Sequence, residues 1–76
     1  MSGFSEQVLE LSVPYLGPAA KKFLERQTTS HMDGLSFDQL QKGHLPELGK
    51  WVEISAGLLI DKAKAKQLAD KIRALA

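Results

Sequence analysis

The tetrapeptide Tyr15-Leu16-Gly17-Pro18 constrains this chain most, because it separates two amphipathic stretches. Proline at the first position of a helix loses only an amide hydrogen that has no partner there. Glycine before it tolerates the backbone angles that a sharp reversal needs. The break therefore predicts several short helices instead of one long helix.

Two helices are expected around this break. The first is predicted to begin at Ser5 and to end near Val13, because the following Pro14 restricts that residue. The second is predicted to run from Pro18 to about Thr28, with apolar residues recurring at helical spacing on one side.

A loop and a short third helix are expected next. Residues 28–34 are rich in threonine, serine, aspartate and glycine, which compete with the helix for backbone hydrogen bonds. Ser36 and Gln39 then have the spacing of a capping box, and Gly43 is placed as a helix stop. The sequence thus predicts a short third helix that ends at Gly43.

The C-terminal half is expected to form two further helices. One begins near Pro46 and runs to about Ile60, and it is apolar on so many sides that it should be central, with Trp51 in the core. The other begins at a capping Asp61. Its narrow apolar stripe consists of Ala65, Leu68, Ala69, Ile72, Leu75 and Ala76.

These expectations combine into one fold class. No stretch alternates apolar and polar residues convincingly, so no β-strand is predicted. The apolar fraction of 43% is near the norm for globular domains, and a chain of 76 residues suits one domain. We therefore predict a single domain, residues 1–76, that is all-α and forms a compact orthogonal bundle of four to five short helices.

Composition also bears on the cellular location of the chain. Without cysteine it has no disulfide and no thiolate ligand or nucleophile. Its N-terminus lacks the basic start and apolar core of a signal peptide, and its longest apolar stretch, 54–60, is too short to span a bilayer. A cytoplasmic location and no membrane partner are the default expectations.

Enzymatic and metal-binding roles find little support in the sequence. His31 and His44, with Asp33 and Asp38 nearby, are the candidate ligands, and no two of them have the i, i+4 helical spacing. Ser30 precedes His31, but no pattern of oxyanion donors surrounds the pair. We expect no catalytic residue, no metal and no cofactor, with a small enzyme or metal protein built on the histidines as the third hypothesis.

The charge distribution supplies an alternative function. Net charge is only +1, yet residues 61–76 carry five basic residues against two acidic ones. Weak nucleic-acid binding through the C-terminal helix is therefore the alternative hypothesis. Its candidate phosphate contacts are Lys62, Lys66, Lys71 and Arg73. Basic side chains opposite an apolar stripe are more often a solvated helix face, so nucleic acid is not the favoured partner.

The apolar content of the last two predicted helices leads to the favoured function. It exceeds what a monomer this small is expected to hide, and any surplus would form a surface patch that marks a partner site. We expect a non-enzymatic protein–protein interaction or regulatory module that docks an unspecified protein or a second copy of itself. The candidate interaction surface is Leu68, Ile72 and Leu75.

One segment also resembles a known group of proteins. Residues 15–21, Tyr-Leu-Gly-Pro-Ala-Ala-Lys, are similar to a signature of small helical modules at the ends of some bacterial signalling proteins. The similarity covers residues 15–24 well and the rest poorly. It implies a regulatory or interaction module, and it carries no catalytic residue over to this chain.

Overall fold

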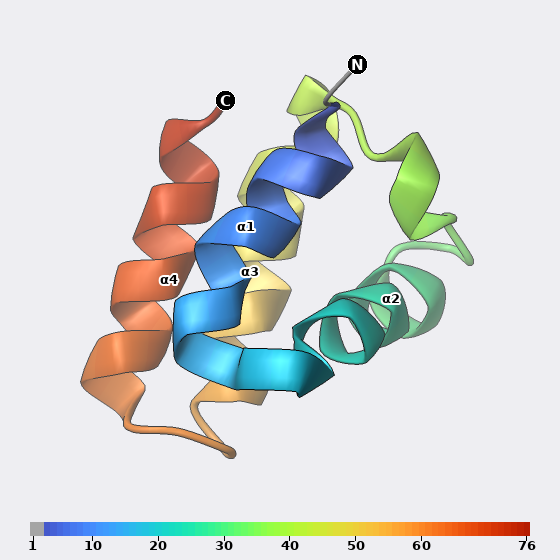
Figure 1. Cartoon of the computed structure of the whole chain (residues 1–76). Coiled ribbons are helices and arrows are strands. Elements are labelled where there is room, and N and C mark those ends of the chain that lie inside the picture. Colours follow the sequence, from blue (N-terminus) through green and yellow to red (C-terminus); the bar gives the residue numbers. More distant parts are fainter. Residues whose placement is uncertain (1–2) are drawn as a thin grey trace.

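The computed structural model describes residues 3–76, and within that range every regular element is helical (Figure 1). The elements in chain order are α1 (Phe4–Leu16), η1 (Gly17–Ala19), α2 (Ala20–His31), η2 (Phe37–Gln39), η3 (Lys42–His44), α3 (Leu45–Ala56) and α4 (Lys62–Ala74). Its extents of 29 × 24 × 22 Å are those of a compact body. The all-α, compact fold predicted from the sequence is confirmed.

α4 packs against both α3 and α1, and α2 crosses these three helices. The axes of α1, α3 and α4 are roughly aligned in Figure 1, with α4 running opposite to the other two, whereas α2 is seen nearly end-on beside them. The most extensive packing between elements is that of α3 against α4. None of the helices in residues 3–76 is long and apolar enough to cross a lipid bilayer.

The predicted number of helices is wrong. Apart from the single turn η2, the helical residues in the described part of the chain form three stretches, 4–31 with a sharp bend at Gly17, 42–56 and 62–74, instead of four to five separate helices. The stretches are longer because the 3₁₀ turn η1 connects α1 directly to α2, and η3 extends α3 at its N-terminus. The amide of Ala20, for example, donates to the carbonyl of Gly17.

The break at Gly17–Pro18 is confirmed, but α1 ends later than predicted. Gly17 has φ 63°, in the region that favours glycine, and Pro18 stands at the start of η1. α1 nevertheless continues through Pro14 to Leu16, since a proline this near the end of a helix removes a single internal hydrogen bond.

The predicted third helix is wrong, and the loop before it begins later than predicted, at Met32. α2 extends past Thr28 to His31, and the Thr28 hydroxyl donates to the carbonyl of Glu25 at 3.1 Å. Ser36 makes no side-chain capping bond, and only the single turn η2 follows it. Leu40 then has extended backbone angles (φ −60°, ψ 132°) that interrupt the helix. The capping box occurs instead at Gln41 and His44.

The C-terminal half follows the predicted pattern with one change. α3 ends at Ala56 and not at Ile60. Asp61 caps α4 as expected, its carboxylate accepting a hydrogen bond from the amide of Ala63 at 3.2 Å. The apolar stripe of α4 faces the core, and α3 contributes four fully buried apolar residues.

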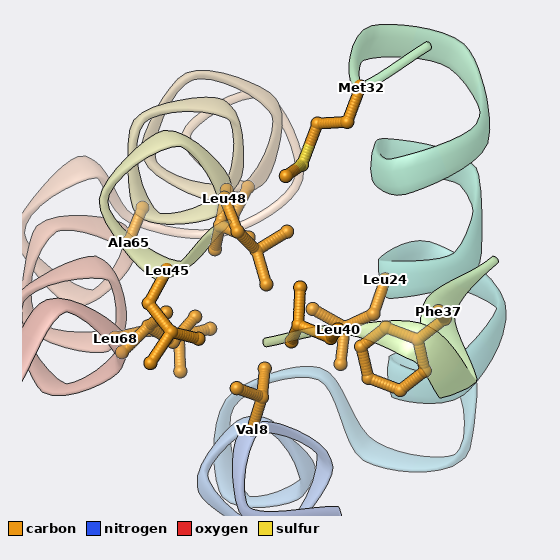
Figure 2. Packing of buried hydrophobic residues seen from close by; sticks show 12 residues of the cluster. Val8, Leu24, Met32, Phe37, Leu40, Leu45, Leu48, Ala65 and Leu68 are labelled. Atoms are coloured by element: carbon orange, nitrogen blue, oxygen red, sulfur yellow. The ribbon is translucent and has the colours of Figure 1, made fainter. Parts of the chain in front are cut away.

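The core lies where the helices meet (Figure 2). Complete burial of a leucine side chain stabilises the fold by about 1.5–3 kcal/mol before entropy is counted. Met32, Phe37 and Leu40, from the segment between α2 and α3, also point into this core. The buried cluster is Val8, Leu24, Met32, Phe37, Leu40, Leu45, Leu48, Val52, Ala56, Ala65, Leu68 and Ile72.

Candidate interaction surface

Among residues 3–76, the most exposed large apolar side chains lie at or beside the turn between α3 and α4. Leu58 is 83% exposed, Leu59 68% and Ile54, near the end of α3, 52%. We call these three residues the turn patch. Exposed leucines of this kind in neighbouring positions are a feature of contact surfaces more than of the free surface of a small monomer.

The backbone around Gly57 explains why the leucines point outward. α3 stops at Gly57, and the amide of Leu59 then donates to the carbonyl of Ala56 at 2.9 Å. The amide of Ile60 donates to the same carbonyl at 2.8 Å. This tight turn satisfies the backbone of the segment locally, while Ile60 packs against the core and the two leucines stay outside.

A hollow of about 210 Å³ lies on one side of the turn patch. Its apolar part consists of Ala19, Phe23 and Leu59, and its polar part of Lys22 and Arg26. We call it the α2 hollow, because four of its five residues come from the end of η1 and from α2. It offers an apolar floor beside two cations one helical turn apart.

A second hollow, of about 300 Å³, is lined by Ile54 and Leu58 of the turn patch, whereas the first is lined by Leu59. We call the second one the α3 hollow, and its lining is Glu53, Ile54, Gly57, Leu58 and Lys62. Glu53 accepts a hydrogen bond from Arg73 at 3.0 Å, so its charge is already compensated within the fold. Both hollows are shallow and open, which suits the side chains of a docked segment better than an enclosed small molecule.

The charges beside the turn patch are mainly positive. Lys22, Arg26 and Lys62 are exposed and make no salt bridge within residues 3–76. Asp61, next to Lys62, is the nearby carboxylate that caps α4. The surface therefore combines apolar side chains with a basic border.

The interaction surface predicted from the sequence is not on the outside of the molecule. Leu68 and Ile72 are fully buried in the core, and Leu75 is half-buried against it. Their amphipathic spacing identified a buried face correctly, but the partners that cover this face are α1 and α3 of the same chain. The surplus apolar surface lies at the turn patch instead.

Three of the candidate phosphate contacts, Lys62, Lys66 and Arg73, share one face of α4, and Lys71 lies on the opposite side. Lys66 and Arg73 both pair with Asp70, at 3.3 and 2.9 Å, and Arg73 also pairs with Glu53. The ammonium group of Lys71 lies 5.2 Å from the centre of the Tyr15 ring. Lys62 is the candidate that borders the turn patch. The structure does not gather the four into one basic cluster.

The two histidines lie in separate surroundings. His44 accepts a hydrogen bond on Nδ1 from the amide of Gln41 at 3.0 Å, which is a capping role. His31 ends α2 and stacks on Trp51. Within residues 3–76 no group of three or more histidine or carboxylate side chains is arranged to hold a metal ion.

Trp51 is half-buried and not in the centre of the core. It packs against the core cluster from α3, with His31 stacked on its ring and the ammonium group of Lys50 5.2 Å from the ring centre. Its indole Nε1 is buried, and within residues 3–76 it has no hydrogen-bond partner. The prediction that Trp51 lies in the core is thus confirmed only in part.

Sequence reasoning missed the turn patch for a definable reason. Leu58 and Leu59 continue the apolar run of the predicted helix 46–60, so they were assigned to its interior. Gly57 and the cap residue Asp61 bracket them closely, and that spacing is the signal of a turn.

Comparison of the chain with protein-family models, curated proteins and solved structures finds no match. The similarity of residues 15–24 to modules of bacterial signalling proteins stays a prediction, as does the cytoplasmic location.

Proposed function

We propose that this chain is a non-enzymatic protein–protein interaction or regulatory module that docks a protein, or a second copy of itself, through the turn patch. The observation that carries the proposal is the exposure of Leu58 and Leu59 beside two open hollows. The proposed docking surface is therefore the turn between α3 and α4, and not the α4 stripe expected from the sequence.

The energetics support a contact role for these residues. Covering a fully exposed leucine contributes about 1.5–3 kcal/mol before the costs of association, so two adjacent leucines form a useful anchor. A rigid turn loses little conformational entropy on binding, and hydrogen bonds from Leu59 and Ile60 to Ala56 fix this turn. An amphipathic helix or an apolar segment laid across both hollows would bury the anchor.

Photo-crosslinking tests this proposal directly. A photo-reactive phenylalanine derivative replaces Leu58 in one variant and the exposed Lys64 of α4 in a control variant. In cells of the source organism, position 58 should give discrete protein adducts that position 64 does not give. Adding Ile54→Ser and Leu59→Ser to the first variant should reduce those adducts at least tenfold.

Two results would contradict the proposal. One is the same diffuse pattern of adducts from positions 58 and 64. The other is a set of adducts at position 58 that persists after Ile54 and Leu59 have been changed, since the contact would then not depend on the turn patch.

A further inference from the structure

We infer that the α2 hollow is filled by α1 of a second copy of this chain, packed antiparallel to α2. This inference rests on the proposed function and names the occupant of one side of the turn patch. It follows from two surfaces of the same molecule whose charges and apolar positions complement each other.

The first surface is a stripe on the outer face of α1. Glu6, Glu10 and Val13 are all exposed, and Val13 is 47% exposed. Their spacing of four and three residues places them on one side of the helix, opposite the fully buried Val8. Neither glutamate makes a salt bridge within residues 3–76. We call these three residues the acidic stripe.

The second surface is the border of the α2 hollow. Lys22 and Arg26 are four residues apart on α2, as Glu6 and Glu10 are on α1. At a rise of about 1.5 Å per residue, both pairs are spaced by about 6 Å along their helices. Two carboxylates can therefore face two cations in a single helix–helix contact.

The apolar positions decide the direction of the pairing. With the helices antiparallel, Glu10 lies opposite Lys22 and Glu6 opposite Arg26, which brings Val13 to the level of Ala19. Ala19 is exposed and belongs to the apolar floor of the hollow, together with Phe23 and Leu59. A parallel pairing would bring Val13 to the exposed polar end of α2 near Thr29 instead.

Charge also argues against the simplest alternative, a symmetric contact of one turn patch with another. Such a contact would bring Lys22, Arg26 and Lys62 of one copy toward the same cations of the next, and juxtaposed like charges oppose association. Pairing the acidic stripe of one copy with the α2 hollow of the other avoids this repulsion. The contact buries one helix face, well below the area of about 1,600 Å² typical of stable complexes, so we expect weak association in the range of about 0.1–1 mM.

Sedimentation velocity of purified variants tests the inference by complementation. Glu6→Gln/Glu10→Gln removes the acidic charges, and Lys22→Gln/Arg26→Gln removes the cations of the hollow. Each variant alone should associate at least tenfold more weakly than the wild type. An equimolar mixture should regain a 1:1 complex, because one intact stripe then meets one intact hollow.

Matched controls separate this contact from general charge effects. Asp33→Asn/Glu47→Gln and Lys42→Gln/Lys64→Gln change net charge by the same amounts at exposed positions outside α1 and α2. Both should associate as the wild type does. Circular dichroism should show that all variants keep the wild-type helix content.

The inference is overturned if the wild type stays monomeric at 1 mM, if the controls weaken association as much as the test variants, or if the mixture shows no complex. Adducts at position 58 with a different protein would then leave the proposed docking function standing without the second copy. Absence of both self-association and such adducts would remove both proposals.

Discussion

His31 and Trp51 stack ring on ring, with centroids 4.2 Å apart and ring planes within 10° of each other. The stack joins the last residue of α2 to the middle of α3 across the sequence gap that contains η2 and η3. It covers a tryptophan that is only half-buried, and so fixes the end of α2 against the central helix.

Removing this stack should be visible in the fluorescence of the only tryptophan. His31→Ala uncovers one face of the indole, so we expect the emission maximum to move to longer wavelength. Because His31 is exposed, the free energy of unfolding should fall by only about 0.5 kcal/mol, at the low end for aromatic pairs. The neighbouring exposed Ser30→Ala is the control and should leave both readings unchanged. An unshifted emission maximum in His31→Ala would show that the stack does not shield Trp51.

The close approach of α3 to α4 depends on Gly49. A Cβ atom added there would lie 2.8 Å from Cγ of Arg73 and 3.3 Å from the backbone oxygen of Ala69. Gly49→Ala should therefore displace Arg73 from Glu53 and lower stability by about 1 kcal/mol, even though alanine is the better helix former by about 1 kcal/mol.

A double-mutant cycle checks this cause by urea unfolding. In the Arg73→Ala background the side chain that obstructs position 49 is gone, so Gly49→Ala should become neutral or stabilising there. Gly43→Ala is the control, because a Cβ atom at that position meets nothing within 4 Å. An equal loss in the free energy of unfolding in both backgrounds would show that the Arg73 side chain is not what obstructs position 49.

Two prolines should respond to replacement in opposite directions. Pro14 lies inside α1 and leaves the carbonyl of Glu10 without its helical donor, whereas Pro18 stands at the start of η1. Pro14→Ala should raise the free energy of unfolding by about 1–2 kcal/mol. Alanine restores the missing donor, and this gain exceeds the loss from a more flexible unfolded chain. Pro18→Ala should lower the free energy of unfolding by about 0.5–1 kcal/mol. Thermal unfolding followed by circular dichroism measures both, and equal signs would contradict these assignments.

Local signals in the sequence were sufficient for the features that local chemistry controls. Gly17 and Pro18 mark a turn by their own backbone preferences, and Asp61 caps a helix through a hydrogen bond to the next turn. The stripe of α4 was readable because its helical period is uninterrupted. These features needed no knowledge of the rest of the fold.

The segment between α2 and α3 could not be predicted in the same way. Its capping pattern, Ser36 with Gln39, favours a helix, but an extended residue at Leu40 ends that helix after one turn. Phe37 and Leu40 are both buried in this arrangement, so tertiary packing outweighs the local signal. Packing likewise placed Leu68 and Ile72 inside, because the sequence shows that a face is apolar without showing which element covers it.

The direct test of the central claim compares the free energy of unfolding in urea of two variants. One is the double variant Leu58→Ser/Leu59→Ser, and the other is Leu68→Ala. If the turn leucines serve contact with a partner and not folding, the double variant should stay within about 0.5 kcal/mol of the wild type. Leu68→Ala, which empties a fully buried position, should lose about 2–5 kcal/mol. A loss in the turn variant as large as that of Leu68→Ala would contradict the claim, since the two leucines would then belong to the core.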